Sequence, residues 1–201
     1  MMPTEDAPRH RILAIALAFA AAAALIVASF SQGWLANATP DGDVTIGLRT
    51  TTECGSIGLT LAEPDQCRTK SNAAYADGWD DHTGRFYSSA FAPMGWVALV
   101  ACLVAALGLL GAAALGLATK KPSPPISPST IALLGLMVSL ITGCVFVATK
   151  PGTPGFVGSG IIFWIFGAGC VVGIPASILL AKVNRPRDPD LMDDAMDPDS
   201  F

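Results

Sequence analysis

Four long stretches without a single Asp, Glu, Lys or Arg constrain this chain more than any other feature of its sequence. They cover residues 12–40, 92–119, 122–149 and 151–181. Each can hold about 20 apolar residues, which is what a helix needs to cross the roughly 30 Å hydrocarbon core of a bilayer. Because backbone polar groups in lipid need partners within their own segment, we expect helices. The predicted transmembrane helices occupy residues 12–31, 91–118, 129–149 and 156–181.

The composition excludes several classes of protein. Charged residues make up only 14% of the 201-residue chain, whereas a soluble globular domain carries about a quarter. This deficit excludes a soluble globular enzyme, and the 52% hydrophobic content excludes a disordered chain. The formal net charge of −4 and the lack of a basic patch exclude a nucleic-acid-binding protein.

The first apolar span also has features of a secretory signal peptide. Arg9, His10 and Arg11 precede it, as basic residues precede the apolar part of a signal. The apolar run over residues 12–31 is longer than that part of a signal usually is. We therefore favour a first helix that stays in the membrane over a cleaved signal.

Basic residues at the ends of the spans predict the orientation, because Lys and Arg accumulate in cytoplasmic loops. They are Arg9, Arg11, Lys120, Lys121, Lys182, Arg185 and Arg187, whereas the turn over 150–155 has only Lys150. We therefore expect segments 1–11, 119–128 and 182–201 in the cytoplasm, and 32–90 and 150–155 outside the plasma membrane, which is the inner membrane in a bacterium. The Pro-rich loop 119–128 should be extended, and the Asp-rich tail 182–201 should be disordered.

Thiols are the only ionisable side chains within the predicted spans. Pumps and ion-coupled transporters usually carry Asp, Glu, Lys, Arg or His there, so a channel or transport subunit is the second choice. The spans instead carry small residues spaced by four, which let helix backbones approach closely. They are Gly135, Ser139, Gly143, Gly169 and Gly173. This spacing predicts packing either within the chain or against another membrane protein.

Two of the five cysteines, Cys54 and Cys67, fall in the predicted outer loop. Cysteines on the oxidising side of a membrane usually form a structural disulfide, which we expect here. A membrane thiol-disulfide oxidoreductase is less favoured, because its quinone-linked dithiol is a CxxC and the chain contains none. Cys102, Cys144 and Cys170 lie within spans, where thiols act as small apolar side chains.

The outer loop also predicts a small antiparallel sheet, because its β-branched and apolar residues alternate. The predicted strands are 33–36, 43–52, 56–61 and 66–70, with Gly55 at a turn. The segment 77–82 gathers three Asp and His82. It could offer oxygens to a cation, but a solvated turn is the simpler interpretation. We expect no catalytic residue, metal site or cofactor.

The spacing of a few outer-loop residues resembles the superfamily of claudins and peripheral myelin protein. The matching residues are Trp34, Gly47, Leu48, Cys54 and Cys67, with Arg85 near the position of an arginine that supports the loop in that family. The chain departs from the pattern at Arg49, where the family has a second Trp, and its spacing up to and between the cysteines is wider. The resemblance implies a four-helix bundle topped by a sheet, which acts through lateral or outward protein contacts.

Together these features predict a non-enzymatic membrane protein that works through protein–protein contacts. It would serve as an accessory subunit of a membrane complex, or self-associate as a claudin-like adhesion or barrier protein. The expected partners are the lipid bilayer and either another membrane protein or a second copy. The outer loop has eight acidic and four basic residues, which favours partners with a basic face. Neither a nucleic acid nor a small-molecule substrate is expected.

Overall fold

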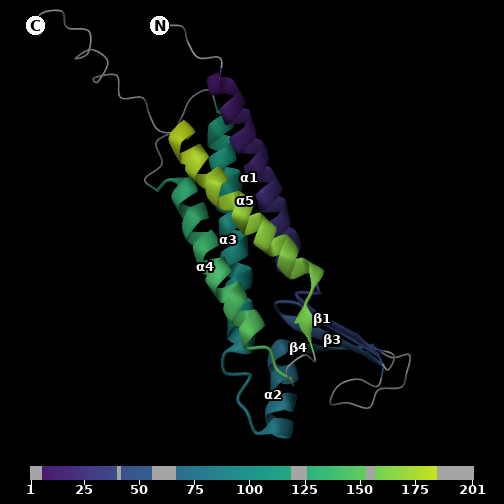
Figure 1. The fold of residues 1–201 in the computed structure, drawn as a ribbon. Helices are drawn as coiled ribbons and strands as arrows, with labels where there is room; N and C mark the ends of the chain where they lie inside the picture. Colours follow the sequence, from purple (N-terminus) through teal and green to yellow (C-terminus); the bar gives the residue numbers. More distant parts are fainter. Residues whose placement is uncertain (1–5, 40–41, 56–66, 119–125, 153–156, 185–201) are drawn as a thin grey trace, which may run out of the picture.

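A computed structural model shows a bundle of four long helices with a small sheet at one end (Figure 1). It describes residues 6–39, 42–55, 67–118, 126–152 and 157–184. The long helices are α1 (Asp6–Phe30), α3 (Phe91–Leu117), α4 (Pro128–Ala148) and α5 (Ile161–Asn184). Helix α1 packs against α3 and α5, and α4 packs against the same two helices. The start of α1 and the end of α5 lie at the end of the bundle opposite the sheet.

The four expected apolar helices are confirmed, and each is long and apolar enough to cross a membrane. The candidate spans are Arg9–Phe30, Phe91–Leu117, Pro128–Ala148 and Ile161–Asn184. Helix α1 begins at Asp6, within the segment expected to precede the first span, and α5 begins at Ile161 rather than at residue 156. Residues 119–125 and 185–201, which hold most of the Pro-rich loop and the acidic tail, lie outside the described residues.

The bundle is apolar both inside and outside. Alanines spaced by four on α1, namely Ala14, Ala18 and Ala22, are fully buried. Large side chains such as Phe19, Leu107 and Leu134 are exposed on the outer surface. A water-soluble protein rarely exposes so much contiguous apolar surface. This distribution suits helices surrounded by hydrocarbon.

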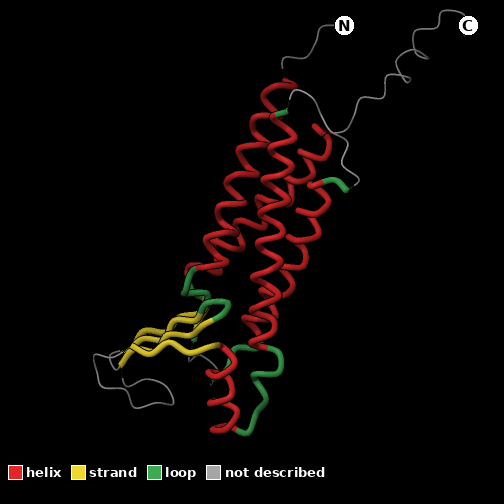
Figure 2. Tube along the Cα trace, turned by 180° about the vertical axis from the view of Figure 1, so that it is seen from behind, coloured by secondary structure: helices red, strands yellow, loops and turns green. Residues whose placement is uncertain are grey.

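The described strands form one five-stranded antiparallel sheet in the order β4-β3-β2-β1-β5. Figure 2 shows this sheet in yellow at one end of the helix bundle. They are β1 (Leu35–Thr39), β2 (Gly42–Ile46), β3 (Thr50–Gly55), β4 (Cys67–Ser71) and β5 (Gly158–Ser159). Consecutive strands from β1 to β4 are neighbours, as in a meander. The predicted sheet in the first loop is therefore confirmed.

The prediction of one strand over 43–52 was wrong. The segment divides into β2 and β3, which pair through Ile46 and Thr51 around a tight turn at 47–49. The backbone N–H of Gly47 donates to the carbonyl of Thr50 and closes this turn. The strand expected over 56–61 lies outside the described residues.

Two elements were not expected. The short helix α2 (Asn72–Thr83) follows β4 directly and contains the segment 77–82 that we interpreted as a turn. Ser71 caps it, because its hydroxyl accepts a hydrogen bond from the N–H of Ala74 at 3.2 Å. Strand β5 comes from the connection between α4 and α5 and pairs with β1, so the sheet is not built from the first loop alone.

Candidate functional site

The disulfide between Cys54 and Cys67 is present, as predicted, and links two neighbouring strands. The two residues are direct partners in the register of β3 and β4. Thirteen positions separate them in sequence, so the bond closes the short connection between these strands. The disulfide therefore fixes the edge strand β4 to the rest of the sheet.

Trp34 lies where the sheet meets the bundle and contacts three of the four long helices. Its side chain is fully buried, and its indole N–H donates to the carbonyl of Ala28 at 2.7 Å in the last turn of α1. The indole lies 4.7 Å from the ring of Phe166 and 6.0 Å from that of Phe146, between ring centroids. Phe146 in turn stacks on Phe91 at the start of α3. All four helices thus meet around one aromatic cluster.

Gly47 and Leu48 occupy the turn between β2 and β3, which rests on the end of the bundle. A side chain at Gly47 would lie 3.0 Å from the carbonyl oxygen of Ser31, so glycine lets the turn approach the chain just after α1 closely. Leu48 is buried, and its carbonyl lies directly against Gly95 of α3. The three residues that match the family pattern here therefore share one structural role, the junction between sheet and bundle.

Asn72 also holds this turn, and sequence reasoning missed it. Its backbone N–H donates to the carbonyl of Arg49 at 3.0 Å, and its side-chain amide donates to the carbonyl of Gly47 at 2.9 Å. Its amide oxygen accepts a hydrogen bond from the hydroxyl of Thr51 at 2.9 Å. The pair Ser71-Asn72 is typical of a helix start and was the available signal.

Arg85 lies away from this junction. It sits in the exposed connection between α2 and α3, and its guanidinium donates to the hydroxyl of Tyr87 at 3.4 Å. Within the described part of the chain, no hydrogen bond joins its side chain to the sheet. A role for Arg85 in supporting the outer loop stays a prediction.

The predicted helix-packing residues are buried within the chain's own bundle. A side chain at Gly135 would come within 2.8 Å of the backbone nitrogen of Ala105, so α4 and α3 touch backbone to backbone there. Gly143 faces Phe166, Gly169 faces Ala24 and Gly173 faces Leu136. Ser139 is fully buried, with its hydroxyl 4.0 Å from the sulfur of Cys170. These residues contact other helices of the same chain.

The two faces of the sheet differ in character. The inner face carries Glu53, which is 3% exposed and whose carboxylate lies 2.9 Å from the ammonium group of Lys70. On the same side, Tyr75 and Trp79 of α2 are buried. Burial raises the pKa of Tyr75 to about 12. The neighbouring Trp79 acts in the opposite direction, and the charge of Glu53 adds to the rise.

The outer face carries a row of threonines across three strands. Thr45 is the register partner of Thr52, and Thr52 is the register partner of Thr69. The hydroxyl oxygens of Thr52 and Thr69 lie 3.0 Å apart. The next row on this face holds exposed Asp43 beside the disulfide. The threonine row is thus an uncharged surface next to the disulfide.

The acidic segment 77–82 of α2 forms hydrogen bonds to the connection between α2 and α3. Asp80 accepts hydrogen bonds from the N–H groups of Tyr87 and Ser88 and from the hydroxyl of Ser88. Desolvation acts to raise the pKa of Asp80, but these hydrogen bonds outweigh it and hold the pKa below its usual value. Within the described ranges, no three His, Cys, Asp or Glu side chains gather as metal ligands would.

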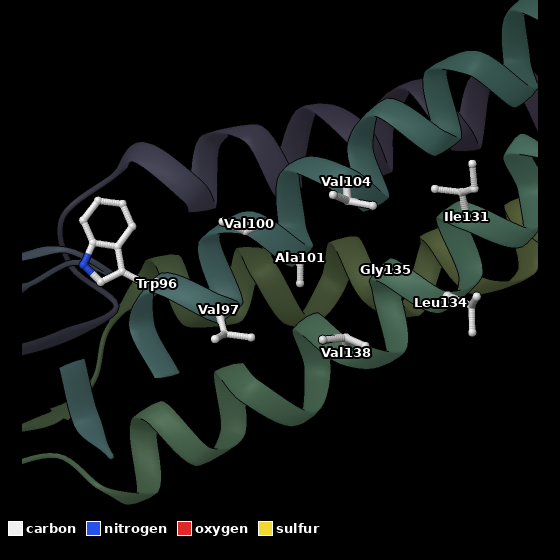
Figure 3. Close-up of a pocket in the computed structure, with 9 residues that line it drawn as sticks. All are labelled: Trp96, Val97, Val100, Ala101, Val104, Ile131, Leu134, Gly135 and Val138. Atoms are coloured by element: carbon white, nitrogen blue, oxygen red, sulfur yellow. The ribbon is translucent and has the colours of Figure 1, made fainter. Parts of the chain in front are cut away.

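An apolar groove of about 580 Å³ runs along the outside of α3 and α4 (Figure 3). The residues that line it are Trp96, Val97, Val100, Ala101, Val104, Ile131, Leu134, Gly135 and Val138. Ala101 and Gly135 are small and buried where the two helices approach closely, whereas the valines and leucine stand at the rims. Trp96 lies at the end of the groove nearest the sheet.

Comparison with known proteins supplies no assignment for this arrangement. No protein-family model matches the chain, and no curated protein matches it.

Proposed function

We propose that the chain is a non-enzymatic integral membrane protein of claudin-like architecture that acts through protein–protein contacts. It serves as an accessory subunit of a membrane complex, or it self-associates in an adhesion or barrier role. In this proposal the helices span the plasma membrane, both termini face the cytoplasm and the sheet faces outside. The basic residues at the ends of the spans support that orientation.

The observation that carries the proposal is the threonine row on the outer face of the sheet. The row carries no charge, and the disulfide beside it links two of the three strands that bear it. A surface that is already rigid loses little conformational freedom when a partner binds. The helix-packing glycines, by contrast, are occupied within the bundle. The sheet is therefore our preferred docking surface.

The first test is purification of the tagged full-length chain from its own host in a mild detergent. We expect either a membrane protein that co-purifies in a fixed molar ratio or a complex with the mass of two or more copies. Thr52→Arg places a charge in the middle of the threonine row and should abolish the complex. Ala73→Arg places the same charge on the exposed surface of α2 and should leave it intact.

Several results would contradict the proposal. A chain that purifies alone as a monomer would count against it, as would a complex that survives Thr52→Arg unchanged. Purified protein that oxidises a dithiol and passes the electrons to a quinone would instead identify the thiol-disulfide oxidoreductase.

The second test concerns orientation and uses a Cys144→Ser background, because Cys144 is an exposed thiol. Ala73→Cys on α2 should react with a membrane-impermeant maleimide in intact cells. Lys182→Cys, at the exposed end of α5, should react only after the cells are permeabilised. The reverse pattern of labelling would refute the proposed orientation.

A further inference from the structure

An arginine lies at the boundary between the apolar bundle and the polar sheet. The guanidinium carbon of Arg49 is 5.9 Å from the ring centroid of Phe30, the last residue of α1. Phe30 is 57% exposed on the outer surface. Among the described residues, the guanidinium of Arg49 forms no ion pair. A cation therefore lies above an exposed aromatic ring, and Arg49 is itself exposed at the surface.

The turn that carries Arg49 contacts α3 at Gly95, the residue next to one that lines the apolar groove. The carbonyl of Leu48 lies against Gly95 of α3, and the next residue of that helix, Trp96, stands at the sheet end of the groove (Figure 3). Indole rings prefer the level of lipid headgroups, where the ring is in apolar surroundings and the N–H can donate. We therefore place Arg49 and Trp96 at the same height along the bundle, where we expect lipid headgroups.

From Trp96 towards the end of the bundle opposite the sheet, the groove is lined only by apolar side chains. Valines of α3 and the isoleucine, leucine and valine of α4 form its rims, and Ala101 and Gly135 form its floor. A groove with this lining and a volume of about 580 Å³ suits a hydrocarbon chain in its chemistry and in the space it offers.

We propose that this surface is a binding site for an anionic phospholipid. The phosphate lies at Arg49, the headgroup contacts the indole N–H of Trp96, and an acyl chain occupies the groove between α3 and α4. Charge complementarity selects this occupant, because guanidinium groups bind phosphate oxygens with two parallel hydrogen bonds. The inference rests on the membrane-spanning helices and is independent of the protein partner proposed above.

The headgroup part of the site is tested with native mass spectrometry of the full-length chain in detergent. Phosphatidylglycerol and phosphatidylcholine with identical acyl chains are the two probes. We expect phosphatidylglycerol to bind more tightly. Arg49→Gln should weaken its binding about fivefold, the effect of one basic side chain near a charged lipid surface, and leave phosphatidylcholine unchanged. Arg68→Gln, an exposed arginine on β4, is the matched control and should change neither.

The groove part is tested with Val100→Trp, which fills the groove from its exposed rim. It should weaken binding of both lipids, whereas Val171→Trp, on an exposed part of α5 outside the groove, should weaken neither. Arg49→Lys keeps the charge without the bidentate geometry and should fall between the native chain and Arg49→Gln. It serves as the test variant if Arg49→Gln does not fold.

Equal affinity of the native chain for the two lipids would overturn the proposal. So would unchanged phosphatidylglycerol binding in both Arg49 variants. If Val100→Trp instead dissociates a dimer and leaves lipid binding unchanged, the groove belongs to a second copy of the chain and the lipid site is refuted. These lipid results stand apart from the co-purification results, which report on the threonine row.

Discussion

The helix bundle and the sheet with α2 are held together by different means. In the bundle, contacts such as Gly135 against Ala105 bring backbones together, and apolar side chains fill the remaining space. In the sheet unit, Asn72, the Glu53–Lys70 pair and a disulfide supply specific polar and covalent links. Helices in lipid gain their association from close packing, because hydrocarbon offers no hydrophobic drive between them. A few short strands in water bury too little surface to be stable alone and need a cross-link.

Trp34→Ala should have the largest effect, because this side chain belongs to both regions. Removing a fully buried Trp costs about 4 kcal/mol, and the carbonyl of Ala28 also loses its donor. Chemical unfolding in detergent, followed by circular dichroism, measures the loss. Trp164→Ala on the exposed side of α5 is the control and should change the unfolding free energy by less than about 0.5 kcal/mol. Equal effects of the two variants would refute the junction role of Trp34.

Replacing both Cys54 and Cys67 with Ser should destabilise the sheet unit and spare the bundle. Closing a loop of this length contributes about 3 kcal/mol. Hydrogen exchange should therefore accelerate at the amides of β3 and β4 and stay slow in α3 and α4. Cys144→Ser should leave exchange unchanged in both regions, since this thiol is exposed. Uniform loss of protection over the whole chain would show that the two regions unfold as one unit.

Gly135→Ala should affect the bundle and spare the sheet. The added methyl group meets the backbone of Ala105, which cannot move aside as a side chain would, so we expect a cost of about 2 kcal/mol. Gly167→Ala is the matched control on α5, because a methyl group there meets nothing within 4 Å. Thermal unfolding in detergent compares the two variants. A Gly135→Ala chain as stable as the control would mean that α3 and α4 separate at little cost.

The pH dependence of the sheet unit has no effect near neutral pH and appears only above pH 10. The chain has two tyrosines, so Tyr87→Phe leaves Tyr75 as the only phenol. Its pKa of about 12 in the folded chain lies above the ordinary value of 10.0, so the fold favours the neutral phenol. The resulting stabilisation is complete below pH 10 and is lost as the pH rises towards 12. Ultraviolet titration should place the midpoint near 12 in the folded chain and near 10 in denaturant.

Tyr75→Phe is the control for this pH dependence, because it removes the titrating group and should abolish the loss of stability at high pH. A midpoint near 10 in the folded chain would mean that water reaches the phenol and that α2 does not pack on the sheet as described.

The sequence predicts the bundle better than the sheet, for physical reasons that particular residues make clear. A long stretch without charged residues predicts a membrane-spanning helix from a single sequence. Two cysteines in one outer loop, Cys54 and Cys67, likewise predict a disulfide. The turn at 47–49 is hidden in the sequence because Leu48 continues the alternation of apolar residues begun by Val44 and Ile46. Strand β5 has two residues and forms only because β1 offers it a partner. The groove arises from the approach of two helices and has no signature in either one.

The pairing of β5 with β1 makes the sheet a mechanical coupling between distant parts of the chain. Leu35 pairs with Ser159, and the N–H of Ile162 donates to the carbonyl of Gly33 just beyond α1. A force on the sheet would therefore act on both α1 and α5. At the opposite edge of the sheet, α2 connects β4 to α3. A tilt of α5 against α1 would therefore act directly on the paired strands β1 and β5. Displacement of α5 relative to α1 would in this way be transmitted to the sheet at the end of the bundle.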